Sequence, residues 1–226
     1  MKGLFVTGTG TGVGKTVVTR AITRCLVNSG RRVMAVKPVE SGVPRKDGMP
    51  APVDVRALMA ACKSRAPMDA HCAYLLTAPV SPHLAAGQDG VVIEEQPILD
   101  LLHRARQNAD IVIAEGAGGL LVPLSDQLLY ADVIARTGFA LLIVAPDALG
   151  SINGTLLTIE AARARAIPVA GVVLNRGPAA ELGNRHAIET IGKVPVLGVL
   201  PHCPLDDEEL AQAAANHLDL RQMLED

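Results

Sequence analysis

Six short apolar runs, separated by longer segments with a helical pattern, constrain the fold of this chain most strongly. The runs are apolar throughout rather than alternating with polar residues, which is typical of parallel strands covered on both faces. They occupy residues 3–7, 32–37, 110–115, 139–145, 168–175 and 195–200. The helical segments occupy about 15–29, 53–63, 95–108, 127–137, 152–166, 180–192 and 207–217. We therefore expect a three-layer α/β fold with a mostly parallel sheet flanked by helices, and a single domain over residues 1–226.

Composition excludes several classes of protein. Of the 226 residues, 49% are hydrophobic and 19% are charged, so the chain is neither a disordered tail nor a coiled coil. The net charge of −2, with two Tyr, two Phe and no Trp, provides neither a basic surface nor stacking platforms, and we expect no nucleic-acid partner. No apolar run approaches the roughly 18 residues of a membrane span, and the four cysteines show no C-x-x-C pair. We expect a cytoplasmic protein with reduced cysteines and no membrane partner.

The stretch TGTGTGVGKT (7–16) follows the first strand and has the features of a phosphate-binding loop. Its glycines let backbone N–H groups turn toward phosphate oxygens, Lys15 supplies a positive charge, and the Thr16 hydroxyl is suited to ligate Mg²⁺. The usual G-x4-G-K-[ST] spacing requires glycine at Thr9, whereas Gly8 lies one residue earlier. The alternative is a glycine-rich turn that holds no ligand.

Ligands of parallel α/β sheets bind at the carboxyl ends of the strands, so polar residues there are candidates for the site. Lys37 ends the second strand and would hold an anion other than the nucleotide, unless it only extends along the sheet edge to solvent. Glu115 ends the third strand and is either a Mg²⁺ ligand or a helix cap. Asp54, at a helix start, has the same two alternatives.

Three further segments carry weaker signals. The helix start Gly150, Ser151, Ile152, Asn153 offers free N–H groups to a carboxylate, with capping by Ser151 as the alternative. Asn175 ends the fifth strand, where its amide matches the hydrogen-bonding edge of a purine. Residues 38–52 are expected to form a surface loop and residues 64–93 an irregular one. Long loops of this kind are often functional.

In order along the chain, these features resemble the dethiobiotin synthetases, a family of the P-loop NTPase type. The matching motifs are TGT-x-T-x-VGKT (7–16), KPV-x-SG (37–42), Asp54, P-x-SPH (79–83), EGAGG (115–119) with PLSD (123–126), LG-x-IN (149–153) and Asn175. The resemblance implies an ATP- and Mg²⁺-dependent enzyme that joins CO2 to 7,8-diaminononanoate, giving dethiobiotin, ADP and phosphate. A carbamate and a carbamic–phosphoric anhydride would be the intermediates.

The resemblance also implies a set of site residues and a homodimer. Lys15 and Lys37 would be catalytic, and Thr16, Asp54 and Glu115 would bind the metal. The nucleotide would contact Gly12, Val13, Gly14, Lys15, Thr16, Val17, Asp54, Glu115, Gly116, Ala117, Gly118, Asn175, Arg176, Pro204, Leu205 and Asp206. The substrate would contact Thr11, Lys37, Ser41, Gly118, Gly150, Ser151, Ile152 and Asn153, with its carboxylate at the helix start 150–153 of the partner chain.

One departure and two rival classes accompany this resemblance. The family often carries acidic residues where this chain has Gly10 and Gly12, so less negative charge lies beside the triphosphate. The main rival is a nucleotide-switch ATPase of the partitioning or septum-positioning type, which carries a second lysine at the position of Gly10. The other is an amide-forming synthetase related to cobyrinate amidation, which needs an ammonia source that this chain is too short to append.

Overall fold

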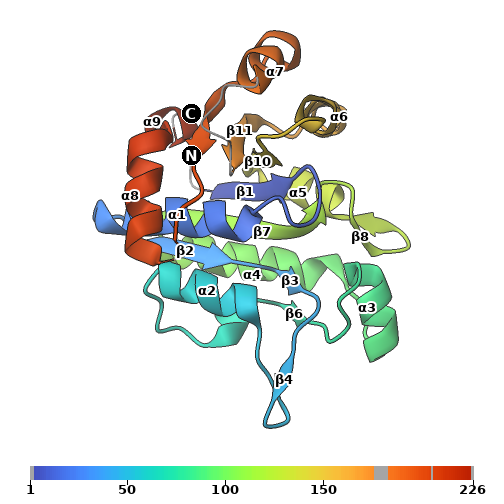
Figure 1. The fold of residues 1–226 in the computed structure, drawn as a ribbon. Coiled ribbons are helices and arrows are strands. Elements are labelled where there is room, and N and C mark those ends of the chain that lie inside the picture. The colour runs from blue at the N-terminus through green and yellow to red at the C-terminus, as the bar shows by residue number, and fades with distance from the viewer. Residues whose placement is uncertain (1–2, 176–182, 205, 225–226) are drawn as a thin grey trace.

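A six-stranded parallel sheet with helices on both faces forms the centre of the molecule, as expected from the apolar runs (Figure 1). The computed structural model describes residues 3–175, 183–204 and 206–224. The strand order is β12-β11-β10-β1-β7-β2, and every neighbouring pair is parallel. The strands are β1 (Gly3–Gly8), β2 (Val33–Val36), β7 (Ile111–Gly119), β10 (Ala140–Pro146), β11 (Val169–Asn175) and β12 (Val196–Leu200). The fold class predicted from the sequence is confirmed.

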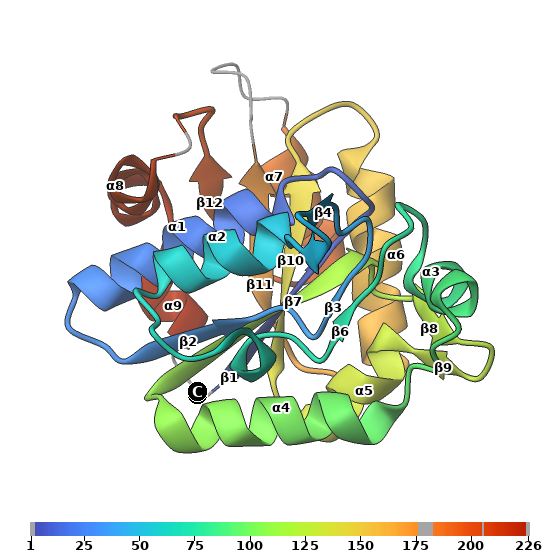
Figure 2. The same ribbon diagram turned by 90° about the horizontal axis from the view of Figure 1, so that it is seen from below.

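Two hydrophobic cores lie on opposite faces of this sheet because side chains alternate along each strand. In β1, Leu4 and Val6 pack on one face and Phe5 on the other. Figure 2 shows α1 and α2 on one side of the sheet and α4 and α5 on the other. One layer contains α1 (Lys15–Asn28), α2 (Val53–Ala61), α8 (Asp207–His217) and α9 (Leu220–Leu224), and the other contains α4 (Glu95–Asn108), α5 (Tyr130–Thr137), α6 (Ser151–Arg163) and α7 (Asn184–Gly192).

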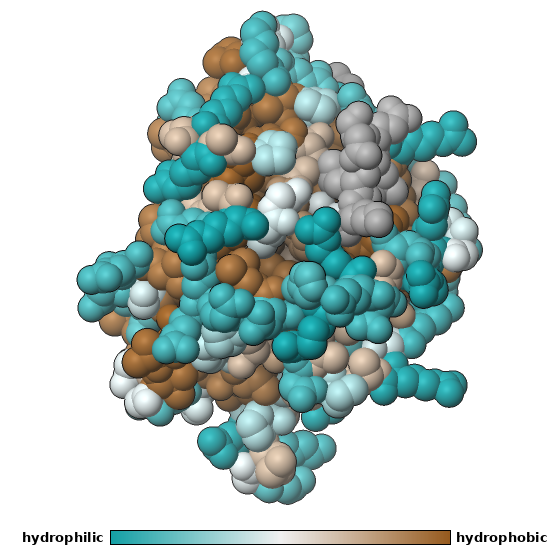
Figure 3. Space-filling model, turned by 180° about the vertical axis from the view of Figure 1, so that it is seen from behind, coloured by the Kyte–Doolittle hydropathy of each residue, from teal (hydrophilic) through white to brown (hydrophobic). Residues whose placement is uncertain are grey.

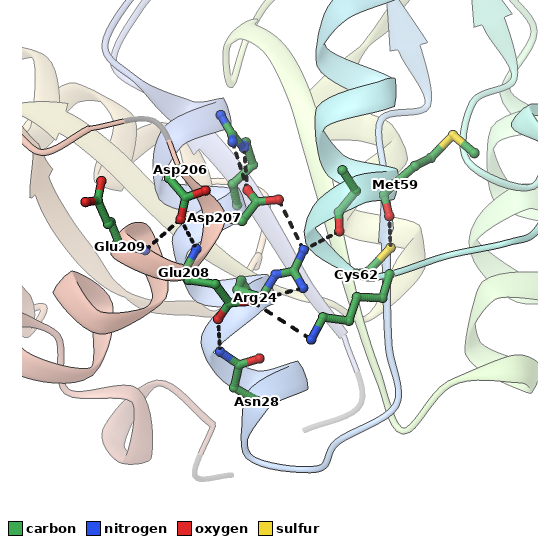
Figure 4. A network of polar contacts seen from close by, with 11 residues as sticks. Arg24, Asn28, Met59, Cys62, Asp206, Asp207, Glu208 and Glu209 are labelled. Atoms are coloured by element: carbon green, nitrogen blue, oxygen red, sulfur yellow. Dashed lines mark hydrogen bonds and ion pairs between the residues drawn. The ribbon is translucent and has the colours of Figure 1, made fainter.

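Ion pairs fasten α8 to the helix that follows the glycine loop. Asp207 accepts hydrogen bonds from Arg20 at 2.9 Å and from Arg24 at 3.2 Å, and Arg24 also donates to the Ala60 carbonyl of α2 (Figure 4). Asn28 of α1 donates to Glu208 at 2.7 Å. Since Arg24 is buried, these pairs fix α1, α2 and α8 as one layer.

The two segments expected to be loops contain more structure than predicted. In the first, β3 (Val39–Glu40) is buried and pairs with β6 (Tyr74–Leu75), whereas β4 (Arg45–Lys46) and β5 (Met49–Pro50) form an exposed hairpin. The irregular assignment of 64–93 was wrong because a short 3₁₀ helix and α3 lie in it. Those helices are Met68–Ala70 and Pro82–Asp89.

The reason for missing α3 is local. Pro82 at its first position looks like a helix breaker, although proline is well tolerated there. Elsewhere, α5 begins at Tyr130, later than expected, because β8 (Pro123–Ser125) and β9 (Leu128–Leu129) form a hairpin before it. The terminal α9 was not predicted. The four cysteines are free, as expected. No helix in the described ranges is long and apolar enough to cross a membrane.

Candidate functional site

A cavity of about 620 Å³ lies where β1, β2 and β7 end, next to the glycine loop. This is the sheet edge at which the sequence analysis placed the ligand. Its position follows from the register, since Val36 of β2 lies beside Ala114 of β7 and the next residues are Lys37 and Glu115. The lining residues are Thr11, Gly12, Gly14, Lys15, Thr16, Val17, Lys37, Ser41, Asp54, Pro79, Val80, Ser81, Pro82, Ala117, Gly118 and Val122.

The glycine loop forms one wall of this cavity and leads directly into α1. Gly14 has φ +96°, and a Cβ atom there would lie 1.8 Å from Asn175 Nδ2, so only glycine fits. Asn175 Nδ2 donates to the Val13 carbonyl at 2.9 Å and so braces the loop from β11. Lys15 Nζ donates to the Gly10 carbonyl at 3.0 Å, and burial lowers the pKa of Lys15. The loop thus has the shape and the charge of a phosphate cradle.

A second buried ammonium lies opposite the loop. Lys37 Nζ donates to Glu115 Oε1 at 2.8 Å and is also ion-paired with Asp54. Burial alone would lower the pKa of Lys37, but the charges of Glu115 and Asp54 together raise it above its ordinary value. Lys37 therefore stays protonated throughout the physiological pH range. It does not run along the sheet edge to solvent, because it is only 5% exposed.

The two acidic side chains do not serve as helix caps. Glu115 lies inside β7 and is fully buried, so no helix begins at it. The first backbone N–H groups of α2, the helix that carries Asp54, are bound by the carboxylate of Glu40 instead. Neither Glu115 nor Asp54 is therefore a helix cap. Both carboxylates are instead ion-paired with Lys37, which lines the cavity.

These oxygen atoms suit a hard divalent cation. Thr16 Oγ1 donates to Glu115 Oε1 at 2.9 Å, which brings the hydroxyl and both carboxylates around Lys37. Glu115 Oε2 is buried and has no hydrogen-bond partner within the described part of the chain. A buried carboxylate oxygen without a partner is costly unless a ligand or ion satisfies it. Across the described residues, no group of three or more His, Cys, Asp or Glu gathers around one point.

Comparison with known proteins decides the family. A family model described as an AAA domain matches residues 2–209. The ATP-dependent dethiobiotin synthetase BioD of Anoxybacillus flavithermus is 42% identical over 211 residues, covering 89% of this chain and 92% of that protein. The one from Ralstonia nicotianae is 38% identical over 223 residues, covering 97% and 96%. The chain belongs to the dethiobiotin synthetase family.

The rival class is similar in fold. The septum site-determining protein MinD complexed with Mg-ADP, from Pyrococcus horikoshii, superposes with a TM-score of 0.57 over 100% of this chain and 90% of that chain. Its sequence identity is only 16%, which shows a common fold and nothing about activity. The family resemblance stated from the motifs is confirmed, and the switch ATPases remain structural neighbours.

Several residues that this family resemblance assigned to the site do not line the cavity. The Ser151 hydroxyl donates to the Pro146 carbonyl and accepts from Ala148 N at 3.3 Å, so it does not cap α6. Asp206 caps α8 by accepting from Glu208 N and Glu209 N (Figure 4). Glu115 contacts the lining residues Thr16 and Lys37 from behind, and Asn175 contacts the glycine loop. The other members that do not line the cavity are Val13, Gly116, Gly150, Ile152, Asn153 and Pro204. Arg176 and Leu205 lie outside the described residues.

Sequence reasoning gave no role to three parts of the site. Pro79–Pro82 and Val122 line the cavity, although only the P-x-SPH motif hinted at the first of these. Ser81 Oγ lies 3.1 Å from His83 Nδ1 at the start of α3. The third is Glu40, whose buried carboxylate binds backbone N–H groups of α2 that lie more than a dozen residues later in the sequence. No local pattern indicates such a contact.

We predict that Gly14→Ala weakens ADP binding by more than about tenfold, because a left-handed backbone and the contact with Asn175 both oppose a side chain. Gly10→Ala is the matched control, since a Cβ atom there meets nothing within 4 Å. Calorimetric titration with ADP should show nearly unchanged affinity for Gly10→Ala. Equal affinities of the two variants would contradict the proposed loop geometry.

Proposed function

We propose that this chain, as one domain over residues 1–226, is an ATP-dependent cyclo-ligase that makes dethiobiotin from 7,8-diaminononanoate and CO2. One amine of the substrate adds to CO2, loses a proton and becomes a carbamate. A carbamate oxygen attacks the γ-phosphorus of ATP, the bond to the bridging oxygen breaks, and ADP leaves. The second amine attacks the carbamoyl carbon, the carbon–oxygen bond breaks, and phosphate leaves with that oxygen as the cyclic urea closes and the amine loses a proton. The observation that carries the proposal is the pairing of a phosphate cradle with a second buried ammonium in a member of this family.

The two lysines have different tasks in this scheme. Lys15 and the loop amides hold the β- and γ-phosphates, and Lys37 stabilises the carbamate and the phosphoryl group during transfer. Phosphoryl transfer depends on position and charge rather than on covalent chemistry by the protein, so fixed cations on both sides of the γ-phosphate suit it. Ser41, Thr11 and Gly118 line the same cavity, and we propose that they contact the diamine.

Thr16, Asp54 and Glu115 fit Mg²⁺ and would hold it beside the phosphates. When bound, the cation neutralises charge on the β- and γ-phosphate oxygens. The carboxylates that would ligate it are the ones that now bind Lys37.

The base is proposed to contact Asn175, Pro204 and Asp206, as the family resemblance implies; Arg176 and Leu205, which share that expectation, lie outside the described residues. Asn175 Nδ2 is engaged with the loop, while its Oδ1 is buried and unpartnered among the described residues. An acceptor in that position suits an exocyclic amino group, as adenine has. This supports ATP as the nucleotide despite the glycines at positions 10 and 12.

A homodimer is proposed because the helix start 150–153 lies outside the cavity of its own chain. Leu149 and Leu157 are exposed on either side of that helix start, as expected for a surface that a second copy covers. The surface seen from behind in Figure 3 carries apolar patches among polar residues. The amides of residues 150–153 would then bind the substrate carboxylate in the partner's site. We place the reaction in the cytoplasm.

Phosphate release tests the proposed function. With ATP and Mg²⁺, release should require both diaminononanoate and bicarbonate, and dethiobiotin should form in equal amount. Each component is omitted in turn, and phosphate and dethiobiotin are measured. Release that is indifferent to the diamine would contradict the ligase and favour a nucleotide switch.

We predict that Lys37→Ala lowers kcat by roughly 10²–10³, since a fixed cation at the transferring group is lost. Nucleotide binding should remain measurable, because Lys15 and the loop are untouched. Steady-state rates and an ADP titration check this, with the exposed Lys63→Ala as a control that keeps normal turnover. Normal turnover of Lys37→Ala would remove Lys37 from the mechanism.

A further inference from the structure

Glu40 is a buried carboxylate to which the reaction scheme assigns no task. Its side chain is 4% exposed, and it follows the end of β2 by only a few residues. Oε1 accepts hydrogen bonds from Val53 N at 2.8 Å and Asp54 N at 3.1 Å, and Oε2 accepts from Val55 N at 2.8 Å. A carboxylate that binds three consecutive amides is held in one orientation and holds those amides in return.

These three amides form the first turn of α2, and the chain offers them no local cap. The residue before the helix is Pro52, which has no side-chain acceptor. Open N–H groups at a helix start attract negative charge, which explains why a carboxylate from a distant segment occupies this position. Glu40 therefore fixes the backbone of α2 at the point where Asp54 leaves it.

The same short segment holds Asp54 from two directions. Lys37 pairs with the Asp54 side chain, and Glu40 binds the Asp54 amide. The segment itself is anchored, because Lys37 N donates to the His71 carbonyl at 2.8 Å and Leu76 N donates to the Glu40 carbonyl at 2.8 Å. The hydrogen-bonded segment 37–40 therefore positions the Asp54 carboxylate, in addition to the packing of α2.

We propose that Glu40 is a positioning residue for the divalent cation, acting through the backbone of Asp54. The inference rests on the proposed role of Asp54 as a Mg²⁺ ligand. Removing a group that orients a metal ligand typically weakens metal affinity by about 10–100-fold while leaving other contacts in place. Among the described residues, the hydrogen bonds of the glycine loop run to β7, β10, β11 and α1 and not to α2. Mg²⁺ affinity and nucleotide affinity should therefore separate.

The test compares Glu40→Ala with the wild-type protein in two measurements. The Mg²⁺ concentration for half-maximal turnover should rise about tenfold or more, with KM for ATP at saturating Mg²⁺ within about twofold. In thermal unfolding with ADP, the added stabilisation by Mg²⁺ should shrink by at least about half. The stabilisation by ADP in the presence of a chelator should stay unchanged.

Two further variants separate positioning from plain loss of stability. Asp132→Ala removes a carboxylate that accepts Leu129 N at the start of α5, away from the cavity, and should lower Tm without moving the Mg²⁺ titration. Glu40→Gln should give an intermediate Mg²⁺ shift, because its amide oxygen still accepts from Val53 and Asp54 whereas its NH₂ group opposes Val55 N. This variant carries the test if Glu40→Ala does not fold.

Asp54→Asn tests the metal-binding role of Asp54 separately from the positioning role of Glu40. If this variant loses the Mg²⁺ response while both Glu40 variants keep that of the wild type, the positioning role is wrong and the metal site stands. If Asp54→Asn itself responds to Mg²⁺ as the wild type does, Asp54 is no ligand and both proposals fall. If Glu40→Ala responds to Mg²⁺ as the wild-type protein does but has a lower Tm, Glu40 serves only as a helix cap.

Discussion

The buried ion pairs of Lys37 with Glu115 and Asp54 are the contacts on which the site depends. A buried ammonium is tolerated only when it is paired, so the strand end of β2 must lie against β7 and the first turn of α2. The parallel register satisfies this directly, because Val36 and Ala114 are neighbours. Once these three elements are joined, the glycine loop after β1 faces them across one cavity.

Charge balance explains why this arrangement is stable before any substrate binds. Lys15 and Lys37 bring two positive charges and Asp54 and Glu115 two negative ones, so the open site is close to neutral. Burial lowers the pKa of Lys15, and an anionic partner favours its charged form. Under the proposed function, Mg²⁺ would offset only part of the negative charge of the triphosphate, and Lys15 and Lys37 would face the rest.

The sheet and the strand-end residues could be predicted because both follow from local patterns. Continuous apolar runs identify buried parallel strands. The polar residues that close two of these runs, Lys37 and Glu115, pair with each other beside the cavity, although β7 continues past Glu115 to Gly119. Glu40 could not be predicted in this way, since its role depends on a contact with α2 that only the folded chain creates. Asn175 was expected to face a purine, which remains a prediction. The contact that the structure shows, with the Val13 carbonyl, could not be predicted because it joins residues far apart in sequence.

Under the proposed function, the site joins two molecules through a phosphorylated carbamate. If a carbamate oxygen attacks the γ-phosphorus, the departing phosphate must carry one oxygen that came from CO2. Turnover with ¹⁸O-labelled bicarbonate, quenched before the label exchanges with water, should therefore give phosphate with one ¹⁸O atom, as measured by mass spectrometry. Unlabelled phosphate formed alongside dethiobiotin would contradict the proposed mechanism.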